Sequence, residues 1–183
     1  IFTMATPILD LNGVGAGNDV TANFVEGTDQ GNQPNDGVLL FQNATLTEGD
    51  SQEIKSITLT LPMVDGSAFE TLGIDNAFDF TGINVVVNVA NGSVDPLDPM
   101  TPTVMTLTPE TGTTASVADF QAVLQAIRYF NTSDEPSETP RSVTVDVVDA
   151  EDETTTQTAT INVEETNDIP ALTVEAGDNS TTE

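Results

Sequence analysis

The fold is decided by residues 143–163, which read VTVDVVDAEDETTTQTATINV. Apolar residues alternate with polar ones in the first part of this stretch, and the same alternation returns in its last part. The apolar positions are Val143, Val145, Val147, Ala159, Ile161 and Val163. A period of two is typical of a strand with one buried face. Two such strands around an acidic turn at residues 149–153 predict a β-hairpin.

The same alternation recurs toward the N-terminus and predicts an all-β protein. Ile57, Leu59 and Leu61 alternate with serine and threonine, which predicts a half-buried strand. Further short strands are expected at residues 7–11, 20–25, 38–41, 69–74 and 83–89, and around 105–107. Many short strands separated by glycine, asparagine and proline favour an antiparallel β-sandwich.

One segment departs from this alternation and predicts a short α-helix over about residues 116–128. Ser116 and Asp119 resemble the two members of a capping box, with Asp in place of the usual Glu. The apolar residues that follow recur at helical spacing, at Val117, Phe120, Leu124 and Ile127. Arg128 falls at the expected C-terminal end, where a cation is favoured. We expect the helix to pack across an end or edge of the sheets.

The composition excludes several classes of function. The chain has 30 Asp and Glu against 3 Lys and Arg, for a formal net charge of −27. A protein with so few basic residues has no patch for nucleic acid or an anionic membrane surface. Cys and His are absent, which excludes disulfides, thiol catalysis, zinc-thiolate sites and histidine bases. No apolar run is long enough to span a membrane.

The stretch after the hairpin, residues 164–172, reads EETNDIPAL and indicates a seam between two domains. It follows a predicted strand and precedes a second apolar run. Asn167 and Asp168 supply oxygens just before Pro170, where the backbone must stay extended. Calcium takes about six to eight oxygen ligands, which this acidic chain has in excess. The seam therefore predicts a calcium-stiffened joint between extracellular repeats.

An internal match supports a tandem arrangement. Residues 170–174 (PALTV) resemble residues 7–11 (PILDL), with a spacing of 170 − 7 = 163 residues. We therefore expect a lead-in at 1–6, one repeat at 7–169, and the first strand of a following repeat at 170–183. Met4, Ala5 and Thr6 stand before Pro7 and lack the donor pair, which predicts that this chain begins a series or a subunit. The unpaired strand 170–175 is expected to pair with a neighbouring repeat or a like subunit.

An ordered series of motifs then identifies a family resemblance. The motifs are PILDLNG from Pro7, FVEG from Phe24, Asp50-Ser51 before ITL from Ile57, ADFQAVL from Ala118, IRYFNTS from Ile127, RSVTV from Arg141 and NDIP from Asn167. Together they resemble the long cadherin-like repeats of giant bacterial surface proteins, over roughly residues 7–175. The resemblance implies a cadherin-like sandwich in a secreted adhesion or matrix protein, with calcium between successive repeats.

The resemblance also implies a set of calcium ligands. In cadherins the ions are held by a Glu near the start, an Asp-x-Glu turn and an Asp-x-Asn-Asp-Asn-x-Pro linker. The nearest matches here are Glu26, Asp149, Glu151, Glu165, Asn167 and Asp168. The linker departs from the pattern, since it opens with Glu and lacks one residue before Pro170. The 149–153 turn and the seam also lie at opposite ends of one strand, roughly 30 Å apart, so one ion cannot bridge both unless the strand bends.

Three functions remain open at this point. The first is a non-catalytic structural or adhesion module of an extracellular bacterial protein, calcium-stiffened and part of a tandem array or surface fibre, with a cell-surface or glycan ligand as a further partner. The alternative is a carbohydrate-binding module, which is disfavoured because Tyr129 and most Phe residues fall in core patterns. The third is a hydrolase with paired carboxylates, but nothing places two acids on converging strand ends. We expect no enzymatic activity.

Overall fold

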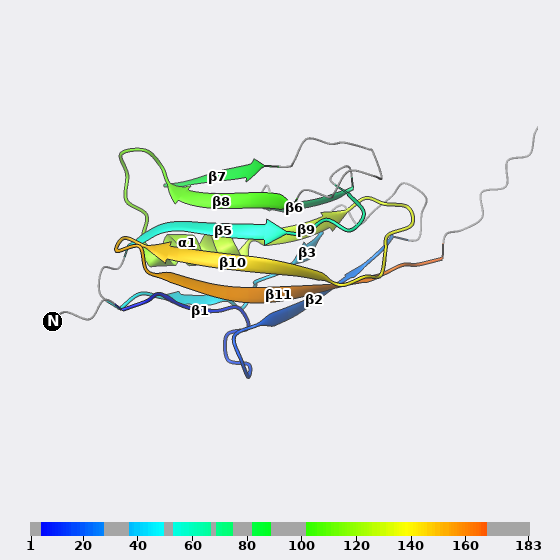
Figure 1. Ribbon diagram of the computed structural model, residues 1–183, viewed down its shortest axis with the longest axis horizontal. Helices are drawn as coiled ribbons and strands as arrows, with labels where there is room; N and C mark the ends of the chain where they lie inside the picture. Colours follow the sequence, from blue (N-terminus) through cyan, green and yellow to red (C-terminus); the bar gives the residue numbers. More distant parts are fainter. Residues whose placement is uncertain are drawn as a thin grey trace, which may run out of the picture.

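The computed structural model describes residues 5–27, 37–49, 53–66, 69–74, 82–88 and 102–167. Short strands dominate this part of the chain, and a short helix lies between β8 and β9 (Figure 1). The elements in chain order are β1 (Ile8–Asp10), β2 (Val20–Val25), β3 (Val38–Leu39), β4 (Thr45–Thr47), β5 (Ile54–Leu61), β6 (Glu70–Ile74), β7 (Ile83–Asn88), β8 (Thr103–Pro109), α1 (Val117–Gln125), β9 (Ile127–Asn131), β10 (Arg141–Asp149) and β11 (Thr154–Glu164).

The predicted hairpin lies inside the larger sheet. Within the described residues this sheet has six strands in the order β2-β11-β10-β5-β8-β7. β10 and β11 pair antiparallel with Val143 opposite Ala159, so the predicted hairpin is confirmed. Their inward side chains are buried, as the alternation of apolar and polar residues required.

One pair in this sheet contradicts the prediction of purely antiparallel strands. β2 lies parallel to β11, with Val20 opposite Ala159 and Val25 opposite Glu164. Parallel neighbours need a long connection between them. β2 and β11 meet this condition because nearly the whole repeat separates them in the sequence. Local alternation carries no information about such a distant partner.

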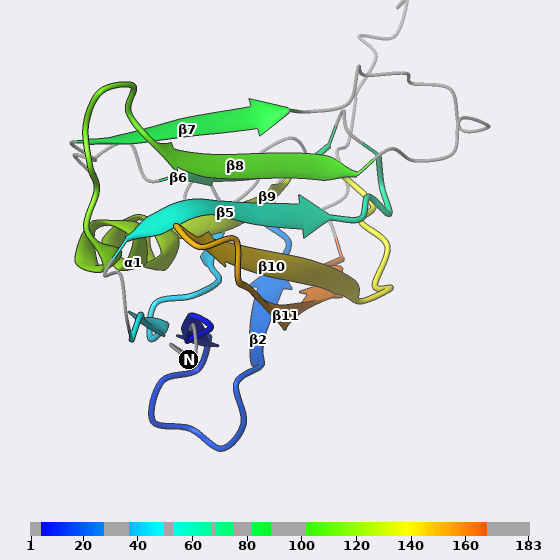
Figure 2. The same ribbon diagram turned by 60° about the vertical axis from the view of Figure 1, so that its left-hand side comes forward.

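A second layer covers one face of the six-stranded sheet. Among the described residues it contains the three-stranded sheet β3-β9-β6 and the pair β1-β4. The rings of Phe24 on β2 and Tyr129 on β9 meet edge to face, with centroids 5.3 Å apart. α1 packs beside this layer against β4 and β5 (Figure 2). An all-β sandwich with a short helix is therefore the observed fold class.

The helix begins as predicted but ends early. Ser116 Oγ accepts a hydrogen bond from Asp119 N at 3.2 Å, and Asp119 Oδ2 accepts one from Ser116 N at 2.8 Å, which confirms the capping box. α1 ends at Gln125, and Arg128 lies in β9 instead of at the helix end. The prediction for Arg128 is wrong because β9 pairs with β3 on one side and β6 on the other. These strand pairings override the helical spacing of the sequence.

Several predictions concern residues outside the described ranges. They include the lead-in up to residue 4, Val89, the donor Asp168 and the whole segment 170–183. The boundary of the repeat and the pairing of strand 170–175 therefore stay predictions.

Candidate functional site

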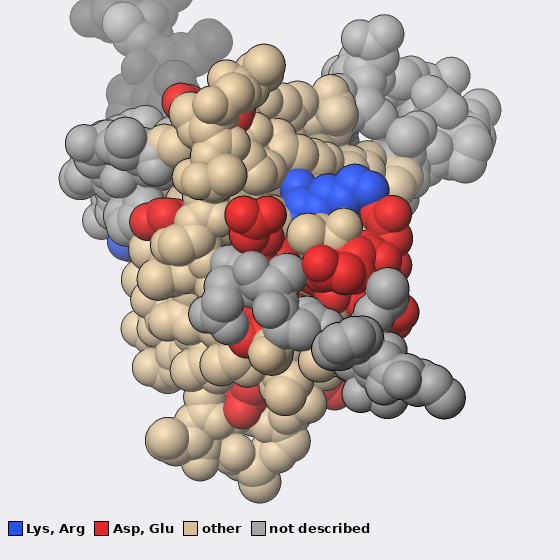
Figure 3. Space-filling model, turned by 90° about the vertical axis from the view of Figure 1, so that its left-hand side faces the viewer, with Lys and Arg blue, Asp and Glu red and all other residues tan. Residues whose placement is uncertain are grey.

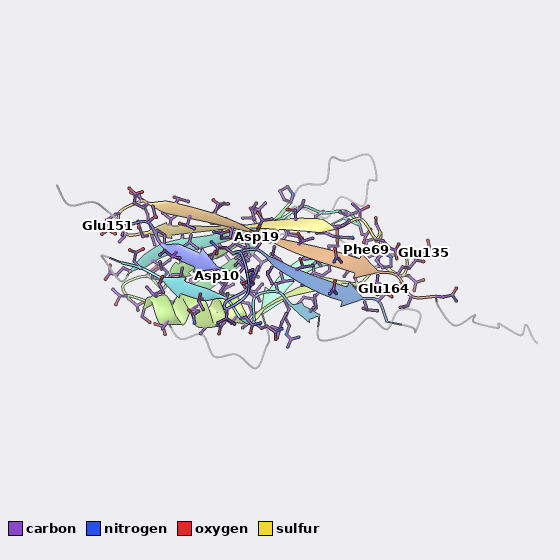
Figure 4. All side chains as sticks on the ribbon, turned by 90° about the horizontal axis from the view of Figure 1, so that it is seen from below. Asp10, Asp19, Phe69, Glu135, Glu151 and Glu164 are labelled. Carbon is purple, nitrogen blue, oxygen red and sulfur yellow. The ribbon has the colours of Figure 1, made fainter. Side chains whose placement is uncertain are left out.

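Five of the six predicted calcium ligands lie in the described residues, and they divide between two ends of the molecule. Figure 4 shows Glu151 at one end and Glu164 at the other. β11 joins these ends, and its eleven residues span roughly 35 Å at about 3.3 Å per residue. Asp149 and Glu151 lie at what we call the hairpin end, the end that carries the β10–β11 turn. Glu26, Glu165 and Asn167 lie at what we call the seam end, where β2 and β11 finish.

The six ligands therefore do not form one site within this chain. In the part of the chain that the structure describes, no group of three or more acidic residues is placed to hold a metal ion. Asp168, the sixth predicted ligand, lies outside that part. The strand length that separates the turn from the seam, expected from the sequence, is confirmed by the eleven residues of β11.

At the hairpin end, Asp149 organises the turn. It is the last residue of β10, and its side chain is completely buried. Its Oδ1 accepts hydrogen bonds from the backbone N–H groups of Glu151 at 3.0 Å and Glu153 at 2.8 Å. Asp152, at a φ of 68°, makes the left-handed step that closes the turn. One carboxylate oxygen of Asp149 is thus fully used by the local backbone.

The other oxygen of Asp149 is the unusual one. Asp149 Oδ2 and Glu151 Oε2 are both shielded from solvent, and neither has a hydrogen-bond partner among the described residues. A buried polar atom left without a partner costs about 1–3 kcal/mol, and more when it is charged. Both oxygens belong to residues of the same turn, where a bound cation would offset their negative charge.

Lys55, a nearby basic residue, does not supply the positive charge for these two oxygens. Lys55 pairs with Asp152, and both side chains are mostly exposed. Such a pair is screened by water and contributes little to stability. Acidic side chains gather over this end of the molecule, with basic atoms at their edge (Figure 3). Lys55 thus pairs with Asp152 and leaves the two buried oxygens without a partner among the described residues.

A further buried acid at the hairpin end, Glu48, was missed by the sequence reasoning. It follows Thr47, which pairs with Ile8, and its Oε1 accepts a hydrogen bond from Gly49 N at 2.7 Å. The N-terminal segment crosses the same end, because Thr155 Oγ1 donates to the carbonyl of Pro7. Glu48 continues the inward face of Leu46 by two residues. That alternation was the signal that could have revealed it.

At the seam end, Glu26 fastens the end of β2 to the chain beyond β11. Its side chain is buried, and Oε2 accepts a hydrogen bond from Thr166 N at 3.1 Å. Thr166 Oγ1 in turn donates to the carbonyl of Glu26 at 3.0 Å. Glu165 and Asn167 flank this threonine and are exposed. The structure thus brings three of the predicted ligands to one end, with Glu26 acting as the anchor of the seam.

A buried ionic network between the two layers was also missed. Glu70 on β6 and Arg141 on β10 are both completely buried, and Arg141 Nε donates to Glu70 Oε1 at 2.6 Å. Tyr129 OH donates to the same oxygen at 2.6 Å. The other oxygen of Glu70 accepts from the N–H groups of Val64 at 2.6 Å and Asp65 at 2.7 Å. Every oxygen of this carboxylate therefore has a donor.

The same network continues through Asp65, so two carboxylates share one guanidinium and neutral donors fill their remaining positions. Asp65 Oδ2 accepts from Arg141 at 2.6 Å and from Asn131 Nδ2 at 2.7 Å. Burial raises the pKa of Tyr129, and the Glu70 carboxylate raises it further. A network whose donors and acceptors are matched in this way stabilises the packing of the two layers. It offers no free group for a ligand.

Two further findings bear on function. No helix in the described ranges is both long and apolar enough to cross a membrane. Comparison with protein-family models, with curated proteins and with solved structures found no match to this chain.

Proposed function

We propose that this chain is a non-catalytic structural or adhesion module of an extracellular bacterial protein, with calcium stiffening its joints to neighbouring repeats. The observation that carries the proposal is the pair of buried oxygens, Asp149 Oδ2 and Glu151 Oε2, that lack a partner. The family resemblance over roughly residues 7–175 supplies the extracellular setting. Two packed layers of mostly antiparallel strands support a sandwich of the cadherin-like type.

The two separated acid groups fit a joint made by two successive repeats. Pro7 lies at the hairpin end, since its carbonyl accepts from Thr155 beside the turn. Pro170 matches Pro7 in the sequence and follows Asn167 by three residues. A following repeat of the same fold would therefore bring its own hairpin end next to the seam end of this one. The equivalents of Asp149 and Glu151 in that repeat would then face Glu165 and Asn167.

This arrangement removes the problem of the strand length. Each joint takes its oxygens from the seam end of one repeat and the hairpin end of the next, so no ion has to span β11. Carboxylate and amide oxygens are the ligands that calcium prefers. Extracellular modules bind it at about 10⁻⁴–10⁻³ M, which matches a joint whose ligands come from two domains.

Calcium-dependent thermal unfolding tests the proposal on the chain itself. At free calcium about tenfold above Kd, binding adds about 1.4 kcal/mol, or a Tm rise of roughly 3–6 °C for a domain of this size. Asp149→Asn should abolish this rise, because the amide removes the negative oxygen and keeps the acceptor for the turn. Asp152→Asn is the matched control: it lies in the same turn, loses the same charge and suits a positive φ. A Tm that is indifferent to millimolar calcium and to chelator would refute calcium binding at the hairpin end of the isolated chain.

Neighbouring repeats or like subunits are the partners that the proposal requires. The predicted strand 170–175 would pair with such a neighbour and extend the array. Truncation after Asp168 should then abolish assembly into fibres, as measured by electron microscopy and light scattering. Unchanged polymers in the truncated protein would contradict strand exchange.

The carbohydrate-binding alternative has weaker support. Tyr129 is fully buried, and Phe69 is the most exposed aromatic among the described residues, at 44%. A sugar platform normally presents its aromatic ring to solvent, so Phe69 is the residue to test. Glycan-array binding that disappears in Phe69→Ala would favour this alternative over the structural module.

A further inference from the structure

β2 and β11 are the first and last strands of the large sheet in sequence order, and they lie side by side and run in the same direction. β2 pairs with β11 over six successive positions, from Val20–Ala159 to Val25–Glu164. Beyond the last of these, Glu26 N donates to the carbonyl of Glu164 at 3.0 Å. β2 and β11 are parallel, whereas the other strand pairs in the described part of this sheet are antiparallel.

Side chains reinforce this pair at its beginning, middle and end. Each of these bonds links a residue on or beside β2 to one on or beside β11, and none is part of the backbone ladder. The three bonds are Thr158 N to Asp19 Oδ1 at 3.1 Å, Asn162 Nδ2 to Asn23 Oδ1 at 3.0 Å, and Thr166 N to Glu26 Oε2 at 3.1 Å. The pair is therefore held more firmly than backbone hydrogen bonds alone would hold it.

A force that pulls the two ends of the described chain apart acts on the β2–β11 pair along the direction of its strands. The described chain enters at the hairpin end, beside β1, and leaves at the seam end after β11 (Figure 1). Tension between these ends passes through β1, which pairs with β4, and then pulls β2 from Val20 and β11 from Glu164, in opposite directions along parallel strands. All the hydrogen bonds between the two strands then bear the force together. A pair pulled from one shared end would instead open one bond at a time.

We propose that the β2–β11 pair is a mechanical clamp, and that bearing tension between its two ends is a function of this module. β10, β5, β8 and β7 lie beyond β11 in the sheet and stay outside the direct line of force. The clamp uses only contacts within one chain. It therefore stands whether or not a cation binds at the hairpin end, and it can be tested in the presence of a chelator.

Single-molecule pulling in two directions tests the clamp. The chain has no cysteine, so paired cysteine substitutions define unique attachment points. Thr6→Cys with Asn167→Cys pulls the strands past each other, whereas Val25→Cys with Asn167→Cys pulls them apart from their shared end. All three positions are exposed, so both variants should keep the wild-type Tm when a chelator removes calcium from Asn167. We expect a several-fold higher unfolding force for the first variant than for the second, at the same pulling speed.

A second pair of variants tests the side-chain reinforcement. Asn162→Ala removes the bond to Asn23 and should lower the unfolding force between positions 6 and 167. Asn84→Ala is the matched control, because Asn84 is an exposed asparagine on β7, outside the line of force. Equal unfolding forces in the two pulling directions would overturn the clamp. An effect of Asn84→Ala as large as that of Asn162→Ala would overturn it as well.

Discussion

Arg141 and Glu70 form a completely buried ion pair that joins the two layers of the sandwich, with Nε 2.6 Å from Oε1. Glu70 comes from the three-stranded sheet and Arg141 from the six-stranded sheet. Removing one member leaves the other charge buried and uncompensated, which costs about 3–5 kcal/mol. We therefore expect Arg141→Met to lower the free energy of unfolding by about that amount, as measured by denaturant titration.

Two comparisons separate the ion pair from a general effect of charge. Lys55→Met removes an exposed pair with Asp152 and should change stability by no more than about 1 kcal/mol. Adding Glu70→Gln to Arg141→Met should recover part of the loss but not all of it, because Glu70 is then neutral while Asp65 still lacks its Arg141 partner. Strictly additive losses would contradict direct coupling of the two side chains.

Tyr129 makes the same network visible at alkaline pH. It is the single tyrosine of the chain, which has no tryptophan, so tyrosinate absorbance reports this residue alone. Burial and the Glu70 carboxylate hold its pKa above the ordinary value. A raised pKa in the folded state means that its contribution to stability is present below the unfolded value of about 10 and is lost above it. We expect no tyrosinate near pH 10 while the protein stays folded, and its appearance together with alkaline unfolding.

The phenylalanine variant provides the control for that prediction. Tyr129→Phe removes the titrating group and should flatten the fall in stability above pH 10 or so. It also leaves Glu70 Oε1 without one donor, so stability at neutral pH should decrease by about 1–3 kcal/mol. Tyrosinate that forms reversibly at the ordinary pKa, without loss of structure, would contradict the buried hydrogen bond.

The capping box of α1 contributes to the folding stability in a way that depends on acidic pH. The side-chain hydrogen bond to Ser116, followed by the backbone bond, lowers the pKa of Asp119. A lowered pKa means that this contribution is present above the unfolded value and is lost as the pH falls through the folded value. Ser116→Ala should cost about 1 kcal/mol at neutral pH, as measured by denaturant titration. Asp119→Asn should reduce the loss of stability on acidification, and an unchanged acid transition would contradict the role of this bond.

The sequence predicted the features that depend on local patterns, namely the buried faces of strands and the start of the helix. The inward valines of β10 and the capping residues of α1 are where the pattern placed them. The same alternation also marks the buried charges, since Arg141 continues the inward face of Val143, and Glu26 continues that of Phe24. The pattern cannot say which buried acid meets Arg141, because Glu70 lies on another sheet. Long-range pairing of this kind depends on the packed layers.

Two other misses have the same physical origin. Ile127 and Arg128, the first two residues of β9, were predicted as the end of the helix because Ile127 fits the helical spacing of the residues before it. Pairing with β3 and β6 decided otherwise. The parallel alignment of β2 with β11 likewise depends on strands that are far apart in the sequence. The division of the candidate ligands between two ends could be predicted, because strand length alone separates the turn from the seam.

A tandem duplicate of the chain tests the proposed joint most directly. We consider residues 5–169 followed by a second copy that starts at Pro7, which preserves the 163-residue spacing of the internal match. Calcium should raise the Tm of this duplicate by more than that of the single chain, because the joint then has ligands from both sides. Small-angle X-ray scattering should show a longer, more rigid particle with calcium and a shorter average end-to-end distance with chelator.

The position of one substitution makes this test specific. Asp149→Asn in the second copy changes the hairpin end that faces the joint, so it should abolish calcium-dependent stiffening. The same substitution in the first copy changes the outer hairpin end and should leave the stiffening intact. Both variants carry the same charge and the same local change in the turn. Equal loss of stiffening in the two variants would show that the hairpin acids do not act across the joint, and retention in both would show that Asp149 is not a ligand there.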